Sequence, residues 1–414
     1  MVDATAPDPP APAPAPENEA PLLTLRDGLP PVVDTPQALD STVAAFAAGT
    51  GPVAIDAERA SGYRYSARAY LVQLRRVGAG TALVDPIPFG ELSTLGGALG
   101  DAEWIVHAAS QDLSCLADLG LRPTALFDTE LAGRLLGYPR VGLGTLVETV
   151  LGSRMRKEHS AADWSKRPLP EPWLEYAALD VEVLLELREA LATQLEEAGK
   201  REWAREEFAH LLTMGPPRPR TDPWRRTSGL HRVRGRRGLA AVRELWQARD
   251  EVAADRDSTP GRILPDAAIV AAANALPADK AALLGLKGFH GRGAARYSTR
   301  WLDALHSARA LPDAELPPVA ARYDGPPPPR AWAERDPVAA ARLNTARTSL
   351  KELAESLDLP LENLLTPDYV RRLLWQPPTE PAGPGEPGAP GPLADLVADR
   401  LRELGARAWQ IQLT

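Results

Sequence analysis

The sequence predicts an α/β domain in the first half of the chain and an all-α region in the second half. Short apolar or alternating runs, bounded by Gly, Pro and Asp, fall between residues 53 and 109 and indicate strands. Runs with apolar residues at helical spacing lie between and after these strands. Beyond residue 200 the strand signals end, and helices alternate with loops up to residue 414.

Length and composition exclude several classes of protein. At 414 residues the chain suits two or three domains. No apolar run approaches the ~20 residues that a membrane helix needs. The acidic, Pro/Ala-rich start lacks the basic residues and apolar stretch of a signal peptide. A single cysteine, Cys115, cannot form an internal disulfide. These features predict a cytoplasmic protein without a membrane partner.

The first domain is expected over residues 22–214, after a disordered Pro/Ala-rich tail at 1–21. Three strands, interpreted as a meander, and a fourth strand are predicted at VAIDAE (53–58), AYLVQLR (69–75), TALVDP (81–86) and WIVHAA (104–109). Helices are expected near 91–100, 110–119, 128–137, 144–151 and 171–198. This order indicates helices packed over one mixed sheet.

The rest of the chain divides at segments rich in Pro, Gly and Arg. A basic linker is predicted at 215–234, followed by a small helical domain at 235–312. A further helical region spans 328–414, with a Pro/Gly-rich insertion at 377–392. It ends in an amphipathic helix at 393–407.

The charge of the chain is unevenly distributed. The net charge is -8, but residues 1–50 alone hold seven acids and one base. Residues 217–237, in contrast, hold eight arginines and one acid. Such a basic tract is typical of phosphate binding, and Arg225, Arg226 and Arg232 are the candidate nucleic-acid-binding residues. The alternative is a solvated linker that packs between domains.

The first candidate site is the Asp56-Ala-Glu58 triplet, which ends the strand at 53–58. Alternation along a strand points both carboxylates to the same side. The chain contains five Asp-x-Glu triplets, so the triplet alone carries little information. This one ends an apolar strand and precedes a loop, which is where an active site can open.

Two further acids follow in the α/β half. Asp112 lies after the fourth strand, in the first turn of an expected helix, where the alternative role is a structural cap. Tyr176 and Asp180 lie four residues apart in a helical stretch and therefore share a face. The alternative for that pair is a surface hydrogen bond. The order of the three motifs, rather than any one of them, favours a shared site.

Residues 50–200 resemble the ribonuclease D branch of the DEDDy exonucleases. The strand Asp-x-Glu, the helix-starting Asp and the helical Tyr-x-x-x-Asp occur in the order of that superfamily. The accompanying words are IDAERASGYRYSARAYLVQLRR, VHAASQDLSCL, FDTELAGRLLGY and DWSKRPL. Proofreading exonucleases usually carry Asn four residues before the second-motif Asp, whereas this chain has Ala108.

The resemblance implies a ribonuclease H-like fold and a two-metal site. Asp56, Glu58, Asp112 and Asp180 would hold two divalent ions, Mg²⁺ or Mn²⁺, and Tyr176 would orient the attacking water. Four clustered carboxylates repel one another and would protonate without cations, which agrees with these roles. His107 is interpreted as a packed strand-end residue, because metal-bound water needs no additional base.

The helical half resembles HRDC domains, which are found in ribonuclease D and RecQ-type helicases. Residues 235–312 carry the phrases VRELWQARDEVAADRDSTPGRILPD and LLGLKGFHGRGAARY. Residues 328–414 look like a more divergent second copy, with the insertion at 377–392 as a departure. Such modules would add phosphate contacts to a catalytic cleft.

The resemblance therefore implies a 3′-5′ exoribonuclease that releases nucleoside 5′-monophosphates and trims tRNA or other structured RNA precursors. One alternative is the same chemistry on single-stranded DNA, because metal-bound phosphates do not report a 2′-hydroxyl. A second alternative is a nucleic-acid-binding protein with an inactive nuclease fold. A monomer is the favoured state.

Overall fold

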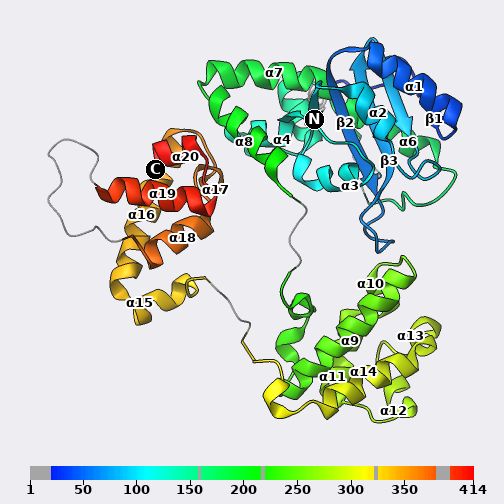
Figure 1. Cartoon of the computed structure of the whole chain (residues 1–414), viewed down its shortest axis with the longest axis vertical. Coiled ribbons are helices and arrows are strands. Elements are labelled where there is room, and N and C mark those ends of the chain that lie inside the picture. The colour runs from blue at the N-terminus through cyan, green and yellow to red at the C-terminus, as the bar shows by residue number, and fades with distance from the viewer. Residues whose placement is uncertain (1–19, 157–158, 160, 216–219, 321–324, 379–391) are drawn as a thin grey trace, which may run out of the picture.

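The computed structural model describes residues 20–156, 159, 161–215, 220–320, 325–378 and 392–414. The tail expected at 1–21 and the insertion expected at 377–392 lie almost entirely outside these residues. Figure 1 shows an α/β body and two helical groups, one formed by α9 to α14 and one by α15 to α20. None of the described helices is both long and apolar enough to cross a bilayer.

The α/β body contains one six-stranded mixed sheet with the order β1-β4-β3-β2-β5-β6. The strands are β1 (Val32–Val33), β2 (Thr50–Arg59), β3 (Ala69–Val77), β4 (Gly80–Val84), β5 (Glu103–Val106) and β6 (Ala125–Asp128). Strands β2, β3 and β4 are antiparallel neighbours, which confirms the predicted meander. Strands β5 and β6 continue the sheet in parallel with β2. The short edge strands β1 and β6 were not predicted.

Helices cover both faces of the sheet, which explains why β2 reads as a continuous apolar run. Val53 and Ile55 pack on one face with α1 (Pro36–Ala48) and α2 (Ser93–Leu99). Ala54 packs on the other face with helices that include α4 (Thr129–Leu135). All three β2 side chains are fully buried. Helix α1 was not predicted from the sequence.

The remaining helices of this body follow the predicted positions closely, except α8, which was not predicted. They are α3 (Leu113–Asp118), α5 (Leu143–Leu146) with a π-helix at Val147–Leu151, α6 (Glu171–Glu182), α7 (Leu184–Glu197) and α8 (Arg201–Thr213). The single helix expected at 171–198 is divided at Val183 into α6 and α7. Helix α6 carries Tyr176 and Asp180 toward the end of β2.

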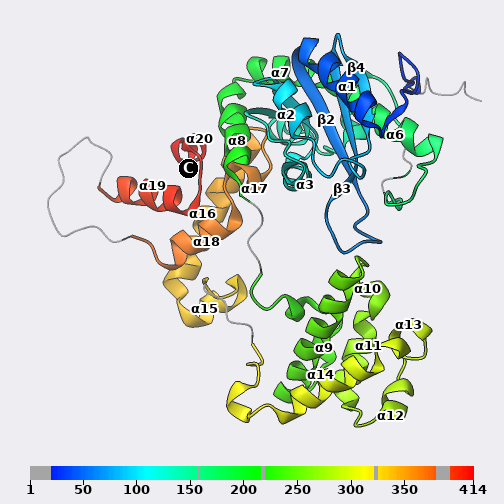
Figure 2. The same cartoon turned by 45° about the vertical axis from the view of Figure 1, so that its right-hand side comes forward.

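The first helical group has its own core. It comprises α9 (Gly235–Asp255), α10 (Pro260–Ile263), α11 (Asp266–Ala275), α12 (Lys280–Leu284), α13 (Arg292–Arg296) and α14 (Ser298–Ala310). Leu245, Phe289 and Trp301 are fully buried in this core. The group touches the α/β body at the β2–β3 loop, where the Ser66 amide donates to Asp257 Oδ1 at 2.9 Å. Figure 2 shows this loop reaching toward α10.

The second helical group packs directly on the α/β body. It comprises α15 (Trp332–Arg335), α16 (Pro337–Ser356), α17 (Leu361–Leu364), α18 (Pro367–Trp375), α19 (Pro392–Leu404) and α20 (Ala408–Leu413). Leu364 and Trp409 lie in one apolar cluster with residues of α7 and α8. The rings of Trp203 and Trp409 stack with centroids 5.0 Å apart. The two parts therefore share a core rather than meeting through a linker alone.

Candidate active site

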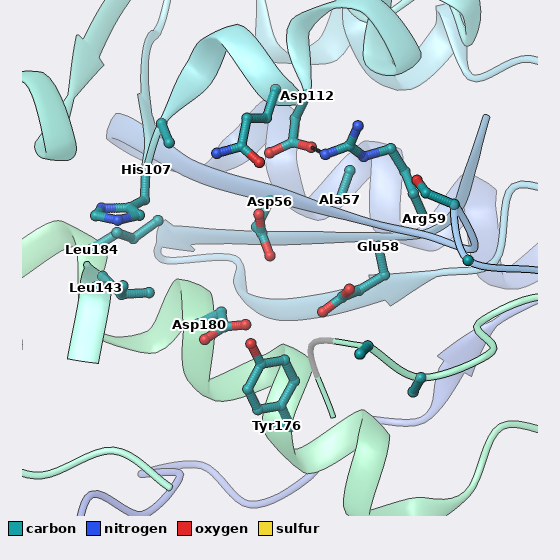
Figure 3. Close-up of a pocket in the computed structure, with 16 residues that line it drawn as sticks. Asp56, Ala57, Glu58, Arg59, His107, Asp112, Leu143, Tyr176, Asp180 and Leu184 are labelled. Carbon is teal, nitrogen blue, oxygen red and sulfur yellow. Dashed lines mark ion pairs between the residues drawn. The ribbon is translucent and has the colours of Figure 1, made fainter. Parts of the chain in front are cut away.

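A cavity of about 370 Å³ opens where β2 ends, and all five predicted catalytic residues line it. Asp56 and Glu58 come from β2, Asp112 from the start of α3, and Tyr176 and Asp180 from α6. Figure 3 shows the five side chains directed into the same space. Residues separated by more than a hundred positions are thus brought together by the packing of α6 against the sheet.

Strand geometry places the first two acids. Asp56 pairs with Gln73 of β3 and Glu58 pairs with Leu71, so both acids face the cavity side of the sheet. The fully buried Gln73 donates from Nε2 to Asp56 Oδ2 at 3.3 Å. This cross-strand contact holds the Asp56 carboxylate at the cavity wall. The sequence analysis missed Gln73, although its position in the AYLVQLR strand was predicted.

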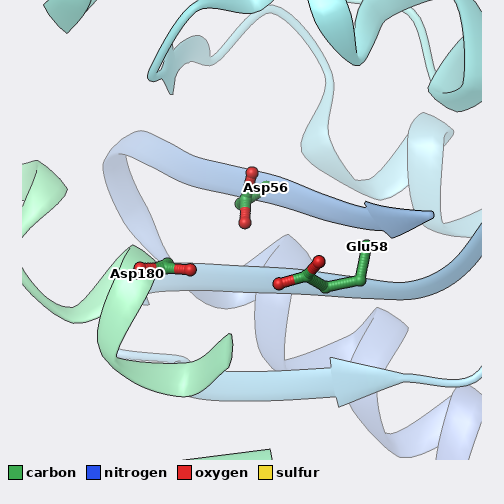
Figure 4. A group of neighbouring side chains, drawn as sticks. All are labelled: Asp56, Glu58 and Asp180. Carbon is green, nitrogen blue, oxygen red and sulfur yellow. The ribbon is translucent and has the colours of Figure 1, made fainter. Parts of the chain in front are cut away.

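Helix α6 completes a three-carboxylate group. Ligand oxygens of Asp56, Glu58 and Asp180 all lie within 4.8 Å of one another (Figure 4). Tyr176 lies one helical turn before Asp180 and lines the same cavity. Hard divalent cations favour carboxylate oxygens as ligands, so the donor set suits a divalent ion. The surface-pair alternative for Tyr176 and Asp180 is wrong, because both line the cavity.

Asp112 lies apart from the group of three. It occupies the N-cap position of α3, but its side chain makes no cap hydrogen bond, so the capping alternative is wrong. Its Oδ1 lies 3.3 Å from Nη2 of Arg59, the last residue of β2. The sequence analysis missed Arg59, because no local pattern relates it to a residue that lies beyond the next three strands.

A buried aspartate fixes the turn that presents Asp112. Asp128, 3% exposed, accepts hydrogen bonds from the amides of Ala108 and Ala109 at 3.1 and 2.8 Å. The same carboxylate caps α4 through the amides of Glu130 and Leu131. Ala108 has φ 59°, a left-handed conformation that these bonds stabilise. The sequence signal was Asp followed by Thr-Glu at a strand-to-helix junction, which is typical of an N-cap.

Burial and mutual repulsion dominate the electrostatics of the cavity. Burial, followed by repulsion from Asp56 and Asp180, raises the pKa of Glu58 to about 10. Burial and the Asp56 charge raise the pKa of Asp112 to about 8. The pKa of Asp180 is well above its ordinary value for the same two reasons. Carboxylates in this state bind protons in the absence of other cations, and divalent ions relieve both effects.

His107 also lines the cavity but has a different character. Its Nδ1 lies 2.9 Å from Thr129 Oγ1. Burial lowers its pKa to about 4, so the ring is neutral near pH 7. This placement agrees with the interpretation of His107 as a packed strand-end residue.

The three predicted nucleic-acid-binding arginines lie outside the cavity and differ in their contacts. Arg225 pairs with Asp222 at 3.1 Å, and its Nη2 donates to the Pro318 carbonyl at 2.8 Å. Its guanidinium also lies 4.3 Å from the centre of the Trp224 ring. Arg226 and Arg232 are exposed. Arg225 therefore packs within the helical group, whereas the other two face solvent.

Comparison with protein-family models divides the chain into three matches. A model described as 3'-5' exonuclease matches residues 30–196. An HRDC domain model matches residues 238–305. A model described as 3' to 5' exonuclease C-terminal domain matches residues 325–414. The exonuclease match contains the cavity, and the other two coincide with the two helical groups.

Individual proteins show the same similarity over most of the chain. A ribonuclease D from Gluconacetobacter diazotrophicus is 35% identical over 67% of this chain and 71% of its own length. The crystal structure of a Bifidobacterium adolescentis protein has 38% identity and a TM-score of 0.85, covering 95% of this chain and 97% of that one. Escherichia coli RNase D, described as an exoribonuclease involved in structured RNA processing, has 25% identity and a TM-score of 0.65, covering 90% and 98%.

Proposed function

This chain belongs to the ribonuclease D family, and we propose that it trims the 3′ ends of structured RNAs such as tRNA precursors. It is a metal-dependent 3′-5′ exoribonuclease. The observation that carries the proposal is the meeting of three carboxylates within 4.8 Å in a cavity that a tyrosine and a fourth acid also line. We also propose that the protein acts in the cytoplasm, where a bacterial cell keeps its RNA.

We assign the metal ligands by the contacts of each acid. Asp56, Glu58 and Asp180 would hold one divalent ion, since their oxygens already lie close together. Asp112 would hold a second ion together with Asp56. After burial, the Asp56 charge has the largest effect on the pKa of Asp112. When bound, two Mg²⁺ or Mn²⁺ ions activate water and stabilise the leaving oxygen of a phosphodiester. The raised pKa values of the acids support this assignment, because cations compensate desolvated carboxylates.

Tyr176 would position the attacking water. Burial, followed by the charges of Asp180 and Glu58, raises the pKa of its phenol, so the hydroxyl stays protonated at neutral pH. A neutral hydroxyl that lines the cavity beside Asp180 can donate a hydrogen bond to a water molecule or accept one from it. The tyrosine therefore acts through orientation rather than as a base.

We further propose that catalysis and RNA binding reside in different domains, as the sequence analysis expects. Residues 22–214 catalyse hydrolysis, and the HRDC domain with the helical region at 328–414 adds contacts to the RNA. The exposed Arg226 and Arg232 of the basic linker would bind phosphates. Arg225 would instead stabilise the helical group, since its guanidinium is occupied by Asp222 and two main-chain carbonyls.

The proposal is tested with a 5′-labelled structured RNA that has a single-stranded 3′ end. With Mg²⁺ or Mn²⁺, we expect a ladder of labelled RNAs shortened from the 3′ end. The released products should be nucleoside 5′-monophosphates. EDTA should abolish the ladder, and a DNA of matched sequence should be degraded more slowly. Products that remain after EDTA, or DNA cleaved faster than RNA, would contradict the proposal.

A further inference from the structure

We propose that Arg59 is a phosphate-binding residue that alternates between Asp112 in the metal-free protein and the RNA backbone once a metal ion binds Asp112. The inference rests on the metal ligands assigned under the proposed function. It concerns a residue that lies next to Glu58 in sequence but belongs to none of the motifs.

A local irregularity of β2 directs Arg59 toward the cavity. Regular alternation would place Arg59 on the opposite face from Asp56 and Glu58. The pairing of β2 with β3 shifts register between Glu58 and Arg59, and such a bulge re-aims the next side chain. Arg59 accordingly lines the cavity and reaches Asp112, as the dashed line in Figure 3 shows.

Arg59 is the cation on which Asp112 depends. Their closest atoms lie 3.3 Å apart, and the Asp112 side chain is only 7% exposed. Within the described part of the chain, Asp112 has no other ion pair. Removal of a buried carboxylate from water is costly unless a cation compensates it. In the metal-free state the guanidinium supplies part of that compensation, since it opposes the effect of burial on the carboxylate.

The same guanidinium and a second metal ion need the same carboxylate. The other three acids already form a separate group, so Asp112 is the ligand left for a second ion. An ion bound there takes over the compensation of Asp112 and releases Arg59. The two cations therefore compete for Asp112. Once the metal ion displaces Arg59, the guanidinium can bind a negatively charged substrate.

The released Arg59 is well placed to bind phosphate. Its side chain is 27% exposed, so it lies at the open side of the cavity. Among the described residues that line the cavity, it is the one with a permanent positive charge. A guanidinium binds phosphate oxygens with two parallel hydrogen bonds, and lysine does so less well. An acidic cavity that accepts an anionic chain gains most from such a residue.

The first test is a calorimetric titration of Mn²⁺ into the full-length protein without RNA. We expect Arg59→Gln to bind the second ion at least about threefold more tightly than the parent, because the competing cation is gone. Arg68→Gln removes a positive charge from the same β2–β3 connection, where Arg68 lies over the Tyr70 ring, and should leave the titration unchanged. An unchanged or weaker second site in Arg59→Gln, or a single ion in both proteins, would overturn the proposal.

The second test separates substrate binding from turnover at saturating Mn²⁺. Arg59→Gln should raise KM for the RNA by about tenfold with kcat within about threefold, because an arginine–phosphate contact is lost. Arg59→Lys should recover part of the KM. A purely structural role would lower kcat and leave KM unchanged, which contradicts the proposal. A parent protein that binds two ions but does not degrade RNA would refute the proposed function, while the Mn²⁺ titration would still decide the competition.

Discussion

Lys200 Nζ donates a hydrogen bond of 2.6 Å to the main-chain carbonyl of Leu357, 157 residues further along the chain. The same ammonium donates to the carbonyls of Leu135 at 2.8 Å and Asp358 at 3.3 Å. One buried side chain thus joins α4 and the start of α8 to the loop after α16. The C-terminal helical group is consequently part of the folded catalytic body.

Lys200→Met should lower the free energy of unfolding by about 2 kcal/mol, because loss of the ammonium group leaves three main-chain carbonyls without their hydrogen-bond donor. Thermal unfolding followed by circular dichroism measures this change. Gly137→Ala should also destabilise the protein at this junction. Gly137 has φ +79°, and an added Cβ would lie 2.6 Å from the Asp358 carbonyl oxygen. Lys166→Met changes an exposed lysine and serves as the control. Equal melting temperatures for Lys200→Met and Lys166→Met would contradict the assignment.

Asp56→Asn should lower kcat/KM for RNA by about a thousandfold or more, because Asp56 is shared between the two proposed ions. RNA binding should persist, which a filter-binding assay at constant salt would show. The matched control is Asp101→Asn at an exposed position, which should retain the parent rate. Degradation by Asp56→Asn at the parent rate would remove this residue from the site.

Asp180→Asn should stabilise the metal-free protein while abolishing hydrolysis. Asp180 is 7% exposed, and burial with the nearby Asp56 charge raises its pKa well above the ordinary value. The neutral amide removes that repulsion, so we expect about 1 kcal/mol of added stability in EDTA, or about 2 to 4 °C. Mg²⁺ should stabilise the parent more than the variant. A variant that melts below the parent in EDTA would show that repulsion does not dominate here.

The metal-free protein should lose stability as the pH rises from 6 to 9. Glu58 and Asp112 have folded-state pKa values of about 10 and about 8, both above their values in an unfolded chain. Their contribution to stability is complete below the unfolded pKa of about 4 and is lost as the pH passes the folded pKa. Asp222 and Asp368, whose pKa values are lowered, contribute in the opposite sense only at acidic pH.

Melting temperatures in EDTA across this pH range test the prediction. The decline should diminish in Glu58→Gln, which no longer titrates. Mg²⁺ should oppose it, since metal ligands bind as carboxylates and metal affinity increases with pH. A flat profile in EDTA, or the same slope in Glu58→Gln, would be inconsistent with repulsion among these acids.

The two kinds of arginine in the basic tract should respond differently to mutation. Replacement of Arg226 and Arg232 by alanine should reduce the slope of log binding constant against log salt by about 1.5 if each contacts a phosphate. Arg225→Ala should keep the slope and lower the melting temperature, because it loses Asp222 and the Pro318 carbonyl. RNA titrations at several salt concentrations measure the slopes. An unchanged slope in the double variant would exclude a phosphate role.

Part of the site follows from local sequence pattern. Alternation along 53–58 predicts that Asp56 and Glu58 share a side, and helical spacing predicts that Tyr176 and Asp180 share a face. Both relationships are present in the structure. The meander was predicted for the same reason, because each strand carries its own periodicity. The very short β1 escaped prediction, since two residues display no repeating pattern, and β6 escaped because it runs directly into the helix expected at 128–137.

The sequence by itself determined the order of the motifs, the change from α/β to all-α structure and the family resemblance, because these depend on neighbouring residues. Tertiary structure alone decided that Asp112 pairs with Arg59, that Arg225 is occupied by main-chain carbonyls, and that the C-terminal helices share a core with α7 and α8. These outcomes depend on which surfaces meet after folding. A charged side chain far along the chain carries no local sign of its eventual partner, so packing rather than periodicity selects it.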